Sequence, residues 1–325
     1  MLKAILENNN RPILALAPMA GASDKAMRIL AQEYGADMLF SEMISAKALT
    51  FSNEKTEKLL DTQGEKGLVA IQLFGHEEEI VSEAGRRAVA LGAQWLDFNM
   101  GCPVPKVVNN HEGSALLKSP EKAINLMRTL VQAVDVPVSV KCRIGWDCYD
   151  KGFMQNFVQG LAETGISLLS VHGRTRQEYY TGKANWQAIS DIVEAISLPV
   201  LANGDVDTPQ KAKEILDTTG ACGIMIGRGA MGRPWLFSEI KTYLGEGILL
   251  PSPSLSERAT LMLRHAKLVI EDKGEYIAMR EMRKHIGWYV KELRYAKVLR
   301  QEASSISTLD DLEHLLNHWK SLLDK

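Results

Sequence analysis

Short apolar runs rich in β-branched residues alternate with segments of helical periodicity over about the first 245 residues. We expect strands at eight of these runs: Ile13–Ala17, Met38–Glu42, Val69–Phe74, Trp95–Asn99, Val138–Lys141, Leu168–His172, Val200–Asn203 and Gly223–Ile226. Between the runs, apolar residues recur three and four positions apart, as in Glu77–Leu91, Ser119–Val134 and Thr208–Leu216. The pattern therefore predicts eight consecutive β/α units.

The residues that precede the strands support this count. Glycine precedes alternate runs, at Gly35, Gly92, Gly165 and Gly220, and proline precedes three others, at Pro12, Pro137 and Pro199. Glycine can end a helix in the left-handed conformation, and proline prevents a preceding helix from continuing. Eight parallel strands with short turns favour a closed (β/α)8 TIM barrel, an α/β fold, over an open sheet.

The pattern changes near Leu244. Glycines and then Pro251-Ser252-Pro253-Ser254 indicate a linker over residues 246–255, and only helical periods follow it. We therefore expect a catalytic barrel over residues 1–245 and a small all-helical domain over residues 256–325.

Composition and charge narrow the possible functions. The 325 residues include 38 Lys and Arg against 40 Asp and Glu, which excludes a globally basic nucleic-acid binder but not a local basic patch. The cysteines form no C-x-x-C pair and the histidines show no ligand spacing with carboxylates, so we predict no metal site. No apolar run reaches the roughly 20 residues of a membrane span, and we expect a cytoplasmic protein.

Polar residues end several of the apolar strands. In a TIM barrel, catalytic and binding groups lie at the carboxyl ends of the strands. The residues at such ends here include Gln72, Asn99, Lys141, His172 and Asn203. Their number favours a ligand-binding mouth over ordinary polar loops.

The loops after the last two strands suit a phosphate group. They read Asn203-Gly204-Asp205 and Gly227-Arg228-Gly229. Glycines let backbone N–H groups approach phosphate oxygens, and Arg228 can pair with the anion. Barrels commonly bind phosphate at this position.

Four side chains at the mouth are candidates for chemistry. Lys141 is placed to stabilise negative charge on a reduced flavin ring. The Gln72 amide has both a donor and an acceptor, which match the hydrogen-bonding groups of an imide edge. Cys102 lies in a loop, and with an ordinary pKa near 8.5 its thiol is protonated at neutral pH and can act as an acid. His172 is placed to bond a phosphate or a ring carbonyl. The alternatives are a surface lysine, a structural amide, a buried cysteine and a structural histidine.

Together these motifs resemble the tRNA-dihydrouridine synthases, flavoproteins that reduce uridine in tRNA. The matching segments run through the barrel in order: Ala17–Gly21, Ser41–Met43, Asp97–Pro103, Lys106–Val107, Gly113–Leu117, Lys141–Trp146, Val171–Thr175, Asn203–Asp205 and Met225–Arg228. The resemblance implies an FMN-binding barrel with a helical C-terminal domain, and NADPH as the electron donor.

The resemblance also implies roles for single residues. Those expected around the flavin are Pro18, Met19, Ala20, Gln72, Lys141 and His172, and those expected at its ribityl and phosphate groups are Asn203, Gly204, Asp205, Gly227 and Arg228. Asn99 and Arg143 are expected to contact the uracil. Reduced FMN would pass hydride to uracil C6 while Cys102 protonates C5.

Basic residues are concentrated in the expected helical domain. On one continuous helix, five of them would share a stripe spaced for phosphate contacts: Arg280, Arg283, Lys284, Lys291 and Arg294. We expect this stripe to bind tRNA, with Arg174 and Arg176 contributing at the barrel rim. The target base must leave its stack to reach a barrel mouth.

Two other functions compete with this interpretation. An FMN barrel that acts on a free pyrimidine or an enone would share the phosphate loops and the lysine, but would have no use for a basic helical domain. A barrel that binds RNA with a vestigial site is disfavoured by the intact Cys102, Lys141 and Gly227-Arg228. The modified tRNA position, the preference for NADPH over NADH and the oligomeric state are not encoded in local motifs.

Overall fold

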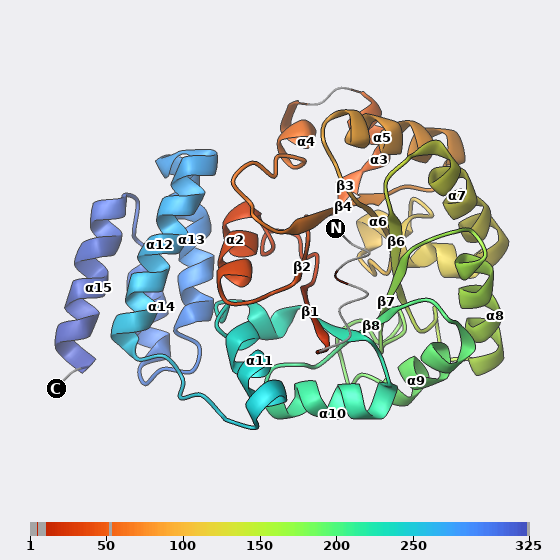
Figure 1. Cartoon of the computed structure of the whole chain (residues 1–325). Coiled ribbons are helices and arrows are strands. Elements are labelled where there is room, and N and C mark those ends of the chain that lie inside the picture. The colour runs from red at the N-terminus through yellow and green to blue at the C-terminus, as the bar shows by residue number, and fades with distance from the viewer. Residues whose placement is uncertain (1–4, 6–10, 52–53, 324–325) are drawn as a thin grey trace.

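A closed barrel of eight parallel strands forms the larger part of the molecule (Figure 1). The computed structural model describes residue 5, residues 11–51 and residues 54–323. Around the barrel the strands are β1 (Ile13–Leu16), β2 (Met38–Phe40), β4 (Leu68–Phe74), β5 (Leu96–Met100), β6 (Val138–Arg143), β7 (Leu168–His172), β8 (Val200–Asn203) and β9 (Gly223–Ile226). Strand β9 pairs with β1 and closes the ring, and the short β3 (Ile44–Ser45) pairs with β4. The predicted TIM barrel is confirmed.

Helices surround the barrel on its outer side, as Figure 1 shows. Their bounds are α2 (Lys25–Glu33), α3 (Ala46–Thr50), α4 (Glu54–Lys58), α5 (Glu78–Ala90), α6 (Pro105–Val108), α7 (Pro120–Ala133), α8 (Lys151–Ala162), α9 (Trp186–Ala195), α10 (Pro209–Thr219) and α11 (Leu236–Glu246). Two short 3-10 helices, η1 (Gly113–Lys118) and η2 (Arg228–Ala230), lie in loops at the carboxyl ends of strands. Gly220, with φ +64°, ends α10 in the left-handed conformation that the sequence predicts.

The two faces of each strand belong to different apolar clusters. Inward-facing residues such as Ala15, Phe40 and Trp95 fill the barrel, whereas Leu14, Leu16 and their counterparts pack beneath the helices. This alternation follows from the two-residue period of a strand. It fixes which polar residues near the strand ends face the interior, and so positions the site.

Among the described residues, four helices follow the barrel and form a bundle on the side of α2 (Figure 1). They are α12 (Leu255–Lys273), α13 (Glu275–Tyr289), α14 (Ala296–Ala303) and α15 (Leu309–Leu323). Ser254 and Glu257 form a capping box that starts α12. Ala26 and Leu30 of α2 join the apolar cluster of these helices, so the two parts share buried surface.

The prediction of one continuous basic stripe is wrong. Helix α13 ends at Tyr289, and a turn leads to Tyr295, whose φ of +65° no helix could continue through. Lys291 and Arg294 therefore lie after the helix and do not continue the stripe of Arg280, Arg283 and Lys284.

A buried polar cluster joins α2 to α12 and α13. The Asp24 carboxylate caps α2 and accepts from Lys273 Nζ at 3.1 Å, and His265 Nδ1 lies 3.1 Å from the Tyr289 hydroxyl. Asp24, His265 and His285 offer ligand atoms within 4.8 Å of one another, although the Lys273 ammonium already supplies a cation to the carboxylate. Among the described residues, no helix has the length and apolar character needed to cross a membrane.

Candidate active site

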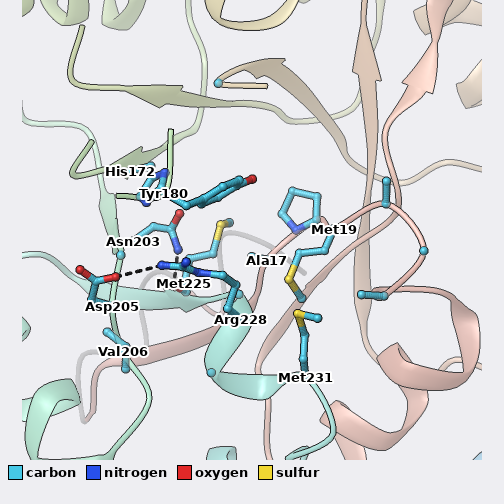
Figure 2. A pocket seen from close by; sticks show the side chains of 18 of the residues that line it. Ala17, Met19, His172, Tyr180, Asn203, Asp205, Val206, Met225, Arg228 and Met231 are labelled. Atoms are coloured by element: carbon cyan, nitrogen blue, oxygen red, sulfur yellow. Dashed lines mark hydrogen bonds and ion pairs between the residues drawn. The ribbon is translucent and has the colours of Figure 1, made fainter. Parts of the chain in front are cut away.

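A cavity of about 970 Å³ opens at the carboxyl ends of the barrel strands. Residues from all around the ring line it, and α13 and the turn after it contribute Lys284, Trp288 and Lys291. In Figure 2, Tyr180 and Arg228 lie between His172 and Asp205 on one side and Met19 on the other. The lining includes every residue predicted for the cofactor: Pro18, Met19, Ala20, Gln72, Lys141, His172, Asn203, Gly204, Asp205, Gly227 and Arg228. The residues predicted from the sequence for the cofactor therefore all lie in the lining of one cavity.

Two amides from β4 and β5 form one side of the cavity. Gln72 Oε1 accepts from Asn99 Nδ2 at 2.9 Å, and Gln72 Nε2 donates to Asp97 at 2.6 Å. Asp97 is fully buried, and burial raises its pKa to about 6 despite the hydrogen bonds from Gln72 and Ser139. It did not figure among the predicted site residues.

The loop that carries Cys102 is fixed by hydrogen bonds to its backbone. Asn99 Oδ1 accepts from the N–H of Cys102 at 2.9 Å, and the Cys102 carbonyl accepts from the N–H and hydroxyl of Ser114. Gly113 has φ +60°, and a Cβ there would lie 2.9 Å from the Cys102 carbonyl oxygen, so glycine is required. Burial raises the pKa of the Cys102 thiol above its ordinary value.

Lys141 projects from β6 toward the cavity. Its ammonium donates to Asn203 Oδ1 at 3.1 Å, while Asn203 Nδ2 donates to the Met225 carbonyl. Burial first, and then repulsion from Arg143, lowers the pKa of Lys141 to about 8. The ammonium is therefore still mostly charged at neutral pH, and its hydrogen bond to Asn203 engages one of its three N–H donors.

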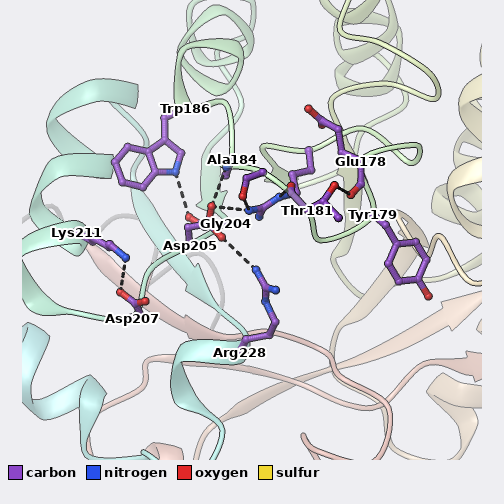
Figure 3. A network of polar contacts seen from close by, with 12 residues as sticks. Glu178, Tyr179, Thr181, Ala184, Trp186, Gly204, Asp205, Asp207, Lys211 and Arg228 are labelled. Carbon is purple, nitrogen blue, oxygen red and sulfur yellow. Dashed lines mark hydrogen bonds and ion pairs between the residues drawn. The ribbon is translucent and has the colours of Figure 1, made fainter. Parts of the chain in front are cut away.

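Asp205 organises the predicted phosphate end, as Figure 3 shows. Its carboxylate accepts from Arg174 at 2.7 Å, from the Ala184 N–H at 2.8 Å and from Arg228 at 3.1 Å. A Cβ on Gly204, whose φ is +134°, would lie 2.7 Å from the Ala184 side chain. The two arginines lower the pKa of Asp205 against the opposing effect of burial, so the carboxylate is ionised and holds Arg228 at the cavity.

Arg174 does not lie at the rim, where the sequence placed it. It is only 1% exposed, and its guanidinium donates to the carbonyls of Thr181 and Gly182 as well as to Asp205. A guanidinium with these partners is not available to RNA. Arg176 is partly exposed and lies with its guanidinium carbon 4.8 Å from the centre of the Trp146 ring.

Arg143 and His172 complete the wall near β6 and β7. Arg143 donates to the carbonyls of Gly101, Thr175 and Tyr179, and thereby links the Cys102 loop to the loop after β7. Its contact with uracil stays a prediction. Burial and neighbouring cations keep the pKa of His172 well below its ordinary value, so the ring is neutral and can both donate and accept.

The basic residues of the helical part divide into two groups. Lys284 and Lys291 line the cavity, and Lys284 Nζ also donates to the Gly21 carbonyl of the β1–α2 loop. Arg283 instead donates twice to the Ile306 carbonyl within the helical part. Arg280 and Arg294 are exposed and lie over Tyr276 and Tyr295 respectively, away from the cavity lining.

Comparison with known proteins identifies the family. A family model described as dihydrouridine synthase (Dus) matches residues 15–323. A tRNA-dihydrouridine synthase B from Vibrio vulnificus is 42% identical over 294 residues, which cover 90% of this chain and 91% of that protein. One from Pseudomonas aeruginosa is 41% identical over 298 residues, covering 91% and 89%. The chain belongs to the dihydrouridine synthase family.

Solved structures of lower identity show the same fold. Histamine dehydrogenase from Rhizobium sp. 4-9 aligns with a TM-score of 0.57 at 13% identity, over 78% of this chain and 48% of that one. Morphinone reductase aligns with a TM-score of 0.54 at 12% identity, over 76% and 88%. This chain spans about half the length of the histamine dehydrogenase chain, and the likeness shows the fold alone.

Sequence reasoning missed several residues of this dihydrouridine synthase cavity. Tyr180 lines it, and its ring centre lies 5.0 Å from the Arg228 guanidinium carbon and 5.5 Å from that of Arg143. Its position in the polar loop after β7, close to two arginines in the sequence, was the available signal. Arg233 and Arg258 also line the cavity, but no local motif marks them.

Proposed function

We propose that the cavity binds FMN and that the chain uses electrons from NADPH to reduce specific uridines of tRNA to 5,6-dihydrouridine. The match to the dihydrouridine synthase family over residues 15–323 is the observation that carries this activity. We place the reaction in the cytoplasm, where tRNA and NADPH are both available.

The donor set of the cavity suits a ligand with both a phosphate and an imide. Arg228 and the glycine-rich loops at positions 204 and 227 lie together at one end, near the partly exposed start of η2. Gln72, Asn99 and Lys141 lie on the β4–β6 side, where they offer amide groups and a cation. Apolar side chains of Met19, Met225 and Met231 are available to cover a flat ring. These features fit FMN.

Lys141 would hold the pyrimidine edge of the flavin. A bound flavin supplies a two-electron hydride carrier whose reduced ring bears negative charge. The Lys141 ammonium, oriented by Asn203, remains charged at pH 7 and has free N–H donors for that edge. Gln72, with one amide N–H not engaged by Asp97, adds a neutral donor beside it.

Cys102 would donate the proton to uracil C5. Its thiol has a pKa raised by burial, so it is protonated at neutral pH, and its loop is held by Asn99 and Ser114. Proton donation leaves a thiolate, which the positive charges of Arg143 and Lys141 stabilise. Solvent then restores the thiol between turnovers.

The tRNA would approach over the mouth beside α13. Lys284 and Lys291 supply cations there, and Trp288 supplies an aromatic face that can stack on a base or sugar. We assign Arg280 and Arg294 to more distant phosphates, because both are exposed. Arg176 is placed to support the Trp146 side of the same rim.

The rival substrate is a free pyrimidine or an enone. The experiment that separates them measures NADPH oxidation by the FMN-loaded protein with unmodified tRNA, free uridine or 2-cyclohexenone as acceptor. We expect rapid turnover with tRNA and turnover at least a hundredfold slower with either small molecule. Faster turnover with a small acceptor than with tRNA would reject tRNA as the substrate.

A further inference from the structure

A line of hydrogen bonds runs from the interior of the barrel to the Cys102 loop. Ser139 Oγ donates to Asp97 Oδ1 at 2.5 Å, and Gln72 Nε2 donates to Asp97 Oδ2 at 2.6 Å. Asn99 Nδ2 then donates to Gln72 Oε1 at 2.9 Å. Finally, the backbone N–H groups of Gly101 and Cys102 donate to Asn99 Oδ1 at 3.1 and 2.9 Å.

The strand register places these groups together. Gln72 pairs with Asp97 across β4 and β5, and Asp97 pairs with Ser139 across β5 and β6. Their neighbours Ile71, Leu73, Leu96 and Phe98 pack outward beneath the helices, so the three polar side chains share one inward-facing level of the barrel. Asn99 lies two residues further along β5 and faces the same way, one level nearer the mouth.

Only one orientation of the Gln72 and Asn99 amides pairs every donor along this line with an acceptor. An ionised carboxylate can only accept, and Asp97, with a pKa of about 6, is mostly ionised at neutral pH. Gln72 must therefore turn its NH2 group to Asp97 and its oxygen to Asn99. The oxygen of Gln72 in turn requires the NH2 group of Asn99, which leaves the Asn99 oxygen for the two backbone N–H groups.

Reversal at the first position would propagate to the last. If Gln72 presented its NH2 group to Asn99, two donors would face each other, and Asn99 would have to rotate. Its NH2 group would then meet the N–H groups of Gly101 and Cys102, which would lose the acceptor that they share in the structure. Buried donors that lose their acceptor destabilise this arrangement, so the loop would move away.

We propose that Asp97 is a positioning residue that fixes the orientation of the Gln72 and Asn99 amides and thereby holds the Cys102 loop in place. It also leaves Asn99 with only an N–H donor for the cavity, which suits a carbonyl oxygen of uracil and opposes the exocyclic amino group of cytosine. This second consequence rests on the proposed contact between Asn99 and the base.

Two variants of similar size separate orientation from packing. In Asp97→Asn, the side-chain oxygen can still accept from Gln72, because the Ser139 hydroxyl can rotate and accept from the new NH2 group. Asp97→Leu fills the same space but offers no acceptor. Asp97→Ala provides a smaller apolar variant in case Leu prevents folding. Ser170→Ala is the matched control, because the Ser170 hydroxyl is buried on β7 and has no hydrogen-bond partner among the residues that the structure describes.

The readout is alkylation of Cys102 by iodoacetamide in the protein without FMN, followed by peptide mass spectrometry. The exposed Cys148 in the same molecule serves as the internal reference. We expect the Cys102 to Cys148 rate ratio to rise at least fivefold in Asp97→Leu and in Asp97→Ala. It should stay within twofold of wild type in Asp97→Asn and Ser170→Ala.

Uridine reduction in tRNA by the FMN-loaded variants should follow the same order, with Asp97→Leu at least tenfold slower than Asp97→Asn. Equal labelling of Cys102 in the Leu and Asn variants would overturn the proposal. Altered labelling with unchanged uridine reduction would leave Asp97 as the anchor of the loop and would instead reject Cys102 as the proton donor. The two failures are therefore distinguishable.

Discussion

Replacing Cys102 by alanine should stop the second half of the reaction and leave the first half intact. The bonds that hold the loop come from the backbone of Cys102, from Asn99 and from Ser114, so the substitution removes the thiol without removing its supports. The cavity lining contributed by Gln72, Lys141 and Arg228 is also unchanged. FMN binding and reduction by NADPH should therefore stay within threefold of wild type.

The expected loss follows from the role of a general acid. A positioned acid accelerates proton transfer by about 10²–10⁴-fold, which corresponds to about 3–5 kcal/mol of transition-state stabilisation. Because Cys102 is the one titratable thiol in this loop and its pKa is raised, the whole of that factor should be lost. In the wild type, the rate should fall as the pH rises through the raised pKa of the thiol, and this fall should be absent in Cys102→Ala.

The assay is anaerobic stopped-flow absorbance of the flavin. The enzyme is reduced with a stoichiometric amount of NADPH and then mixed with unmodified tRNA, and reoxidation of the flavin is followed. Cys148→Ala, which changes an exposed cysteine, is the control and should behave as wild type. Reoxidation of Cys102→Ala by tRNA within threefold of the wild-type rate would refute the assignment of Cys102 as the acid.

Three further predictions concern the phosphate end, the tRNA surface and stability. Arg228→Ala should raise the Kd for FMN about tenfold to a hundredfold, because a charge-assisted hydrogen bond is worth about 1.5–3 kcal/mol. Fluorescence titration measures this Kd, and an unchanged value would remove Arg228 from the cofactor site. The double variant Lys284→Glu and Lys291→Glu should raise KM for tRNA at least tenfold in a salt-dependent manner and leave NADPH oxidation unchanged. Arg283→Gln should have little effect on KM for tRNA. Equal effects on KM would contradict the division of the basic residues into two groups. Burial lowers the pKa of His265 to about 4. As the pH falls below about 6.5, His265 therefore takes up a proton in the unfolded state while it stays neutral in the native state. The free energy of unfolding should therefore decrease by about 1.4 kcal/mol per pH unit, or about 3 kcal/mol between about pH 6.5 and 4. Urea unfolding curves should show this decrease, and it should be smaller in His265→Gln.

The sequence predicted the barrel and its mouth because both depend on local pattern. Apolar runs, together with glycine or proline before most of them, defined the strands, and residues at strand ends such as Lys141 and Asn203 then had to lie at one rim. A closed ring brings these residues together whatever their separation along the chain. Residues that line the cavity were therefore accessible to motif reasoning.

Charge patterns were less informative because they do not reveal partners. Arg174 and Arg283 have the same charge as Lys284, but the first is buried against Asp205 and the second is held by the Ile306 carbonyl. The stripe also assumed one helix from Arg280 to Arg294, whereas α13 ends at Tyr289. Such contacts depend on the packing of distant segments, and no local spacing encodes them.

Asp97 shows a further limit of the sequence. It lies within strand β5, and the sequence marks it only as part of a matching motif, without indicating a role for its side chain. Its consequence, the direction of a line of hydrogen bonds through Gln72 and Asn99, exists only once three strands are in register. The structure was needed to place it.

The most direct test of the whole account measures dihydrouridine in tRNA from a host that lacks the corresponding enzyme. The tRNA is analysed by mass spectrometry and mapped before and after incubation with this protein, FMN and NADPH. We predict new dihydrouridine at defined positions, dependent on NADPH and absent with Cys102→Ala. A yellow protein that NADPH reduces, but that forms no dihydrouridine in any such tRNA, would contradict the account.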